Sequence, residues 1–348
     1  MNWIFLAFDR ELISLVSFVV MSTSTELSRS YGALVGLAIG DALGMPTQSL
    51  SYEAIREQFH KVNTFNDPSP QHPYAAGLKA GMVTDDTEQS LLVASLLTSS
   101  GGAFDQREFA RQLLLWEDSV HERELFDLLG PSTKVALSNL QAGMDPALTG
   151  RKGTTNGAAM RIAPVGIICP STDIDRLVNK VIEVSMLTHN TSSALGAAAA
   201  VAGIISGSID SMDPDDAVAL GIEAAERASL HGTQDGGGIV SRIKRAVVIA
   251  SSGDDEQLRK EIGTSVNATQ SVPCAIGLFV MYQSNPWEGC CTAASIGDDT
   301  DTIAAIAGAM LGASCGPDGF PGNAIKTVET INSLNLRGVA EDLLALRH

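Results

Sequence analysis

The sequence has few positive charges, no cysteine pair of the C-x-x-C kind and no recognisable export signal. Its 348 residues carry 23 Lys and Arg against 40 Asp and Glu, which gives a formal net charge of −17. Because affinity for nucleic acids draws mainly on Lys and Arg that neutralise phosphates, this balance excludes a nucleic-acid-binding function. The five cysteines form no zinc or redox pattern and indicate reduced, buried thiols in a cytoplasmic protein.

The amino terminus contains a short apolar run, LISLVSFVVM, at residues 12–21. The run is shorter than the ~20 residues that span a bilayer, and its flanks lack the cationic excess and the A-x-A pattern of an export signal. A polar stretch follows Met21, so we expect Met21 to be the natural start and residues 1–21 to be a non-native or disordered extension. The alternative is a helix that binds a partner or a membrane surface. We place one domain at residues 22–348 and expect no membrane association.

Helical periodicity recurs along this domain, whereas the alternation typical of strands is nearly absent. Residues 174–185 place their apolar side chains at the spacing of a single helix face. Ser171 or Thr172 is expected to cap this helix, and Asp213 followed by Pro214 indicates the start of another. The chain is 45% apolar and 18% charged, which suits a large core. The predicted fold class is all-α, a compact single-domain bundle of many helices.

Small residues recur at helical spacing near the start of the domain. Glycine occupies every fourth position from Gly32 to Gly44. Each glycine costs a helix about 1 kcal/mol relative to alanine, so close packing has to compensate. Four-residue spacing lays the glycines along one face and predicts that a second helix backbone approaches there.

Acidic and threonine residues cluster at two expected helix starts, residues 84–87 and 298–302. One acid at a helix start is explained by the free N–H groups and the helix dipole, and solvated caps are the simpler alternative. Two or three adjacent carboxylates exceed this need and raise one another's pKa unless a cation is present. Neither segment contains His or Cys, so the ligand set favours Mg²⁺, or Mn²⁺, over zinc.

Four motifs follow one another along the chain in a specific order. They are GLAIGDALGMPTQ at 36–48, TDDT at 84–87, TTNGAAMRIAPVG at 154–166 and GDDTDTIAAIAGAMLGA at 297–313. From about Tyr31 to Gly316 the sequence resembles the ADP-ribosylglycohydrolase family. The resemblance implies an all-α fold with two Mg²⁺ ions, or Mn²⁺, in a cleft. It also implies hydrolysis of the bond at the ribose anomeric carbon of ADP-ribosylated proteins or small ribosyl acceptors.

The resemblance assigns roles to individual residues. The acids and threonines of the second and fourth motifs match the family's metal ligands, and three of the acids are candidates to activate water as catalytic groups. The loop of the third motif and a later histidine match substrate contacts, while Asp41 is expected to support the site through hydrogen bonds. The expected metal ligands are Thr84, Asp85, Asp86, Asp299, Asp301 and Thr302, the catalytic candidates are Asp85, Asp86 and Asp299, and the substrate contacts are Asn156, Gly157, Ala158, Met160 and His189.

Gln48 occupies the position at which many members of the family have a glutamate. An amide cannot accept a proton, so we expect Gln48 to contact substrate and a carboxylate elsewhere to activate water. This difference predicts slow hydrolysis of substrates with poor leaving groups, and weak or absent hydrolysis of arginine-linked ADP-ribose. It also keeps open a hydrolase of a free nucleoside or another ribosyl metabolite. A third alternative is a non-catalytic module that binds ADP-ribose.

Overall fold

The structure is a computed structural model that describes the backbone of residues 4–123 and 129–347, and the side chains of this part from Ser24 onward. Every regular element in these ranges is helical, which confirms the predicted all-α fold; two isolated bridges, Thr155 with Asn267 and Thr191 with Thr233, are the β-type pairings seen there. The elements are α1 (Ile4–Gly44), η1 (Met45–Thr47), α2 (Tyr52–Phe59), α3 (Asp85–Ser99), α4 (Gln106–Glu122), α5 (Pro131–Gln141), α6 (Pro146–Thr149), α7 (Gly157–Met160), α8 (Ala163–Ile168), α9 (Ile174–Ser185), α10 (Ser192–Ile209), α11 (Pro214–Ala228), α12 (Ile239–Ala250), α13 (Asp255–Ile262), α14 (Ala268–Met281), α15 (Pro286–Ala293), α16 (Thr300–Cys315), η2 (Pro317–Gly319), α17 (Gly322–Ile331) and α18 (Leu336–Leu344).

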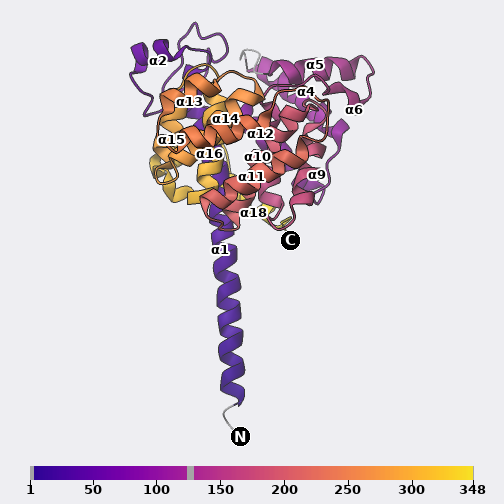
Figure 1. The fold of residues 1–348 in the computed structure, drawn as a ribbon, viewed down its shortest axis with the longest axis vertical. Helices are drawn as coiled ribbons and strands as arrows, with labels where there is room; N and C mark the ends of the chain where they lie inside the picture. Colours follow the sequence, from indigo (N-terminus) through magenta and orange to yellow (C-terminus); the bar gives the residue numbers. More distant parts are fainter. Residues whose placement is uncertain (1–3, 124–128, 348) are drawn as a thin grey trace.

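The helices form one body from which the first part of α1 projects (Figure 1). Its second part enters the body, where residues 33–45 are almost completely buried. The side chains of residues 1–23 lie outside the described part of the chain, so the predicted domain start at residue 22 stays a prediction.

The two helices that carry the first and last motifs, α1 and α16, are packed backbone to backbone. A Cβ atom added to Gly36 would lie 1.9 Å from the carbonyl oxygen of Gly308, and one added to Gly40 would lie 2.0 Å from that of Ala304. No side chain fits in such a space. The glycine stripe therefore does what its spacing predicted, and it fixes the carboxyl end of α1 beside the start of α16.

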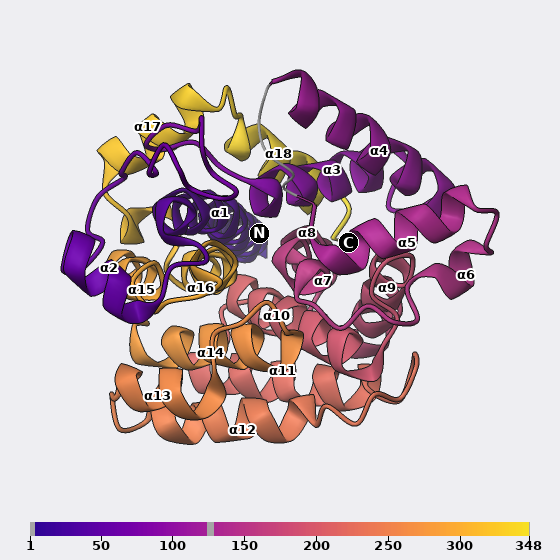
Figure 2. The ribbon, with the colours of Figure 1, turned by 90° about the horizontal axis from the view of Figure 1, so that it is seen from above.

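Helix α10 lies at the centre of the body (Figure 2), and all of its residues, Ser192–Ile209, are buried. In the described part of the chain it is the helix whose length and apolar composition would also suit a membrane crossing. Here neighbouring helices cover it on every side. Its small side chains allow α8, α11 and α16 to approach it closely.

The starts of the outer helices follow the usual capping rules, with two corrections to the sequence predictions. Asp173 caps α9 by accepting a hydrogen bond from the Arg176 N–H, so the expected caps Ser171 and Thr172 were wrong by one or two residues. Asp213 stands at the N-cap position of α11 as expected, but its side chain makes no capping bond. Pro214 at the first helical position sets the backbone angle without that bond.

Candidate active site

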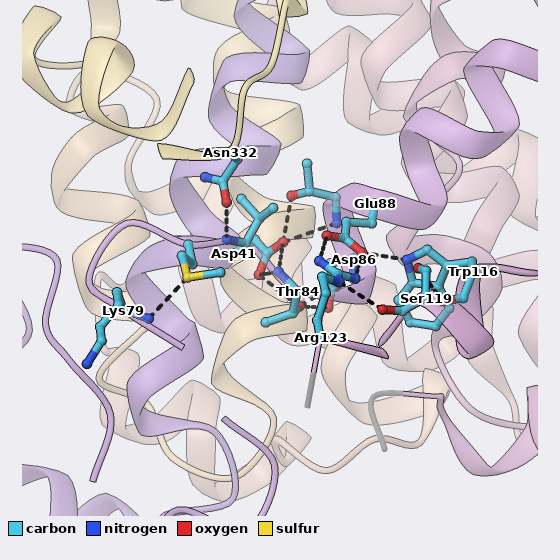
Figure 3. Close-up of polar contacts among 12 residues, drawn as sticks. Asp41, Lys79, Thr84, Asp86, Glu88, Trp116, Ser119, Arg123 and Asn332 are labelled. Atoms are coloured by element: carbon cyan, nitrogen blue, oxygen red, sulfur yellow. Dashed lines mark hydrogen bonds and ion pairs between the residues drawn. The ribbon is translucent and has the colours of Figure 1, made fainter. Parts of the chain in front are cut away.

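Asp41, in the last turn of α1, anchors the start of α3. Its carboxylate is completely buried and accepts hydrogen bonds from the backbone N–H and the hydroxyl of both Thr84 and Thr87, the shortest being 2.6 Å from Thr87 Oγ1 (Figure 3). Burial raises the pKa of Asp41 to about 6, although these hydrogen bonds oppose the rise. As expected from the sequence, Asp41 supports the site through hydrogen bonds.

Further contacts hold α3 from both sides (Figure 3). Before the helix, the Asn332 side chain accepts a hydrogen bond from the Val83 N–H at 3.1 Å. One turn into it, Glu88 receives the indole N–H of Trp116 and pairs with Arg123 at 2.8 Å. The first turn of α3 is thus fixed on a rigid support, which is the requirement for a precise site.

The two acid-bearing helix starts meet at Asp86. Thr302, in the first turn of α16, points its hydroxyl at Asp86 Oδ2 at 3.4 Å, and Oγ1 of Thr84, the N-cap of α3, lies 3.2 Å from the same oxygen. Segments more than 200 residues apart in the chain therefore share one polar centre. The predicted convergence of the second and fourth motifs is present in the fold.

Two carboxylate oxygens in this centre have no hydrogen-bond partner. Asp86 Oδ1 and Asp301 Oδ1 are fully buried and unpaired. Burial, and then the charge of Asp301, raises the pKa of Asp86 well above its ordinary value; burial, followed by the charge of Asp299, does the same for Asp301. Unpaired buried polar atoms are costly in native proteins, and a bound cation would supply the partner that these two oxygens lack.

The donor set fits a hard divalent cation. Carboxylates of Asp85, Asp86, Asp299 and Asp301 and nearby threonine hydroxyls are all oxygen donors, the type that Mg²⁺ and Mn²⁺ prefer. Among the described residues, no three acidic, His or Cys side chains stand in a completed metal-binding arrangement. The fit therefore rests on the donor chemistry and on the two unpaired oxygens.

A cavity of about 270 Å³ opens over these acids. It lies between the segment after α1, the start of α5 and the third-motif loop, and no basic side chain is among its described lining residues. Those residues are Gln48, Ser49, Tyr74, Asp85, Leu129, Gly130, Pro131, Thr133, Thr155, Asn156, Gly157, Met160, Val266, Asp299, Asp301 and Thr302.

Most of the residues predicted from the sequence reach this cavity, and a few lie behind it. Asn156 lines it and donates from its amide to Asp299 Oδ2 and, at 2.9 Å, to Ser271 Oγ. The lining includes eight predicted residues, and the predicted residues that do not line the cavity are Thr84, Asp86, Ala158 and His189, all buried.

His189 lies directly behind the third-motif loop. Its ring nitrogens are 2.9 Å from Thr155 Oγ1 and 2.7 Å from Thr188 Oγ1, and a Cβ on Gly157 would come within 2.8 Å of the ring. Complete burial, followed by the nearby Arg161 charge, lowers the pKa of His189 well below its usual value. A neutral His189 thus supports the loop from behind; it does not line the cavity, and its contact with substrate stays a prediction.

The sequence reasoning missed Arg161, which is fully buried next to His189. Its guanidinium donates to Gln89 Oε1 at 2.9 Å and to Thr188, and its carbon lies 5.0 Å from the centre of the Phe109 ring. Burial lowers the pKa of Arg161 to about 10, and the Asp85 charge partly opposes this shift. The sequence feature that could have indicated a buried arginine is its position within the otherwise small and apolar run AAMRIAPVG.

Asp298 interrupts the glycine-led turn before α16 with a left-handed backbone, at φ 59°. Its side chain is exposed and accepts a hydrogen bond from Thr264 Oγ1 at 2.6 Å. Asp298 does not line the cavity, whereas Asp299 and Asp301 of the same motif do.

Comparisons with known proteins agree with the family resemblance that the four motifs indicate. The sequence profile of the ADP-ribosylglycohydrolase family matches residues 22–348. An uncharacterized Escherichia coli protein, YegU, is 30% identical over 92% of this chain and 97% of its own, and the ADP-ribosylarginine hydrolase Tri1 of Pseudomonas putida is 28% identical over 91% and 78%. A solved ADP-ribosylglycohydrolase-related protein complex matches at a TM-score of 0.71 and 26% identity, over 93% of this chain and 100% of that chain. The chain belongs to the ADP-ribosylglycohydrolase family and is a hydrolase of the glycosidase type.

Proposed function

We propose that the protein is a divalent-metal-dependent hydrolase that cleaves the bond between the ribose anomeric carbon and the acceptor in ADP-ribosylated proteins or small ribosyl compounds. The observation that carries this proposal is the pair of unpaired carboxylate oxygens on Asp86 and Asp301 beside the cavity. The Pseudomonas relative, named for ADP-ribosylarginine, supports the same bond type.

The candidate residues to hold Mg²⁺ or Mn²⁺, as two ions, are those that surround the unpaired oxygens. Asp86 and Asp301 provide them, Asp85 and Asp299 lie at the cavity wall, and Thr84 and Thr302 add hydroxyl oxygens. When bound, such ions orient ribose hydroxyls and offset charge that develops at the anomeric centre.

The phosphates of an ADP-ribosyl group find a suitable place at the start of α5. Gly130, the N-cap, has no side chain to satisfy the free N–H groups of the first turn, and Gly130, Pro131 and Thr133 line the cavity. Helix N-termini of this kind bind phosphate through these N–H groups and the dipole. Because the lining lacks basic side chains, this start and the bound cations would supply the positive potential.

Proton transfer falls to the carboxylates at the cavity wall. Asp299 is half-buried, is oriented by the Asn156 amide, and has a pKa raised by burial to about 6. Asp85 is half-buried at the same wall, and burial followed by the charge of Asp41 raises its pKa well above the ordinary value. Gln48 lines the cavity but cannot accept a proton, so Asp85 and Asp299 at the wall, and Asp86 buried behind it, remain the candidates to activate water.

A product assay tests this proposal. Release of ADP-ribose is measured from ADP-ribosyl-arginine and ADP-ribosyl-serine peptides, and release of free base from nucleosides, each with Mg²⁺, Mn²⁺ or excess chelator. We expect ADP-ribose release that requires the metal. Base release alone would favour the nucleoside hydrolase, binding of ADP-ribose without turnover would favour a binding module, and full turnover in chelator would refute the metal requirement.

A further inference from the structure

A second cavity, of about 90 Å³, lies between α2, α13 and α15. Figure 1 and Figure 2 place these three helices together on one side of the body. Among the described residues, none lines both this cavity and the larger one over the acids. A water molecule needs roughly 10–15 Å³ of such space, so the second cavity has room for a small ion with several oxygen atoms. Its described lining includes three basic side chains, Arg56, Lys61 and Arg259, whereas that of the larger cavity includes none.

Arg259, on α13, is held in place without a polar partner. Its guanidinium carbon lies 4.2 Å from the centre of the ring of Tyr52, the first residue of α2. Its Nε is buried and unpaired, and no other atom in the described part of the chain accepts a hydrogen bond from its guanidinium. A guanidinium has five N–H donors and keeps its positive charge. A half-buried arginine that is fixed on a ring and has no acceptor is therefore available to bind an anion.

Two further donors without partners line the same cavity. Arg56 lies one turn after Tyr52 on α2 and forms no ion pair within the ranges that the structure describes. Thr292, on α15, is buried, and its Oγ1 has no hydrogen-bond partner. Lys61, in contrast, is paired with Glu288, so it is not a free donor. Unpartnered donors from three different helices thus meet at one cavity.

Two acids in the first turn of α13 also line the second cavity. Glu256 is paired with Lys260 at 2.5 Å, whereas Asp255 forms no ion pair within the described part of the chain. Once the paired side chains are set aside, the guanidiniums of Arg56 and Arg259 remain against the single carboxylate of Asp255. The charge of the cavity is therefore positive, although the chain as a whole carries −17.

We propose that the second cavity is a binding site for an oxyanion of the phosphate class. Arg56 and Arg259 hold the anion through charge-assisted hydrogen bonds, which are the strong ones, and Thr292 adds a neutral hydroxyl. Asp255 opposes the anion and limits its affinity. The site is separate from the larger cavity and does not depend on the proposed hydrolase function.

The two helices that carry these arginines both lead to the wall of the larger cavity. The N–H of Ser49, just before α2, donates to the carbonyl oxygen of Asp298 at 2.6 Å. The N–H of Asp299 donates to the carbonyl oxygen of Thr264, just after α13, at 3.1 Å. Ser49 and Asp299 line the larger cavity. An anion bound between α2 and α13 therefore joins two helices whose ends are attached to that wall.

The test is a calorimetric titration of inorganic phosphate into the metal-free protein, without substrate and at constant ionic strength. We expect saturable binding at one site. Arg259→Met and Arg56→Met should each raise the dissociation constant about tenfold or more, because each removes a hydrogen bond to a charged group. The matched control is Arg245→Met, which should keep the native constant, because Arg245 is exposed on α12 and is already paired with Glu261 at 2.5 Å.

Asp255→Asn should lower the dissociation constant, because it removes the like charge from the cavity. A misfolded variant cannot produce this gain, so it complements the two losses. Titration with AMP distinguishes two sources of the anion: binding as tight as that of phosphate, and equally sensitive to both arginine variants, indicates a phosphate group on a larger molecule, whereas binding of phosphate alone indicates the free ion. Absence of saturable phosphate binding, or equal constants in the native protein, Arg56→Met and Arg259→Met, would overturn the inference.

Discussion

Asp41, Asp86 and Asp301 are all buried carboxylates beside the starts of α3 and α16, yet their hydrogen bonding differs. Asp41 accepts hydrogen bonds from two N–H groups and two hydroxyls. Asp86 and Asp301 each keep one oxygen without a partner. A saturated carboxylate has no capacity left for a ligand, whereas an unsaturated one is destabilised until a ligand arrives.

This difference in hydrogen bonding indicates that Asp41 has a structural role, whereas Asp86 and Asp301 are available to bind a ligand. Asp41 stabilises the protein by joining α1 to α3, whereas the unpaired oxygens of Asp86 and Asp301 destabilise it, as the proposed cation binding would require. Removing either kind of acid should therefore change different quantities, and the following predictions start from the largest expected change.

The largest change is expected for Asp301→Asn, which keeps the shape of the side chain and removes its charge. Loss of a cation's charge stabilisation, worth several kcal/mol, should lower kcat by about 10³-fold. Stability in chelator should stay equal or rise, because a buried charge is removed. Asp298→Asn is the matched control: Asp298 lies in the same motif but is exposed and outside the cavity lining, so its activity should change less than about threefold. Near-native activity of Asp301→Asn would contradict the comparison.

Asp41→Ala should show the reverse pattern in unfolding experiments. The substitution leaves the N–H groups and hydroxyls of Thr84 and Thr87 without an acceptor in a buried place, at a cost of about 3 kcal/mol of unfolding free energy. Urea unfolding in excess chelator measures this loss without interference from bound metal. If Asp41→Ala were as stable as the native protein, the supporting role of Asp41 would be wrong.

Gln48→Glu adds a further carboxylate to the cavity and tests whether an added proton acceptor raises activity. Gln48 is half-buried at the wall, and a glutamate there can accept a proton. General acid–base catalysis contributes roughly 10²–10⁴ in rate. We therefore expect Gln48→Glu to raise kcat/KM at least about tenfold on the best ribosyl substrate. The measurement is kcat/KM on matched nitrogen- and oxygen-linked substrates at saturating Mg²⁺. A slower variant on every substrate would make Gln48 a binding residue instead.

The acids Asp86, Asp299 and Asp301 also predict how stability depends on pH. Their folded-state pKa values are raised, to about 6 for Asp299 and well above the ordinary value for Asp86 and Asp301, so the folded state binds more protons than the unfolded chain. In chelator the free energy of unfolding should therefore fall as pH rises from the ordinary aspartate pKa of 3.8 through 6 and beyond. Added Mg²⁺ should flatten this slope, and so should Asp301→Asn. A slope that is unaffected by both would contradict the assignment.

The smallest effect is expected at the amino terminus. The first part of α1 projects from the body (Figure 1), and the family profile begins at residue 22. A chain that starts at Met21 keeps Asp41 and the complete acid cluster, so its melting temperature and activity should equal those of the full chain. A large decrease in either would show that residues 1–20 pack against the domain.

The sequence was sufficient to predict those features that depend on spacing along the chain. Four-residue glycine spacing predicted the close contact of α1 with another helix, and the order of the acid motifs predicted a shared centre. Features that depend on three-dimensional surroundings were not predictable. The sequence shows Asp41 and Asp86 as similar acids, and only the fold shows that one is saturated and the other is not.

Two buried side chains show the same limit. The role of His72 could not be predicted from a spacing pattern. Two of its partners are N–H groups in the adjacent turn, and the third is the carbonyl oxygen of Gln48, 24 residues away. Arg161 could be suspected from its apolar neighbours, but its partners Gln89 and Thr188 are brought to it by packing. Conversely, His189 matched a family segment near the cleft, and the fold places it behind the loop.

The most direct test of the central claim is calorimetric titration of Mg²⁺ into metal-free native protein and into Asp301→Asn, followed by ADP-ribose release from the same samples. We predict saturable binding of two ions by the native protein, weakened binding by Asp301→Asn, and turnover that appears only as the ions bind. Absence of saturable binding in the native protein, together with full turnover in excess chelator, would contradict the account.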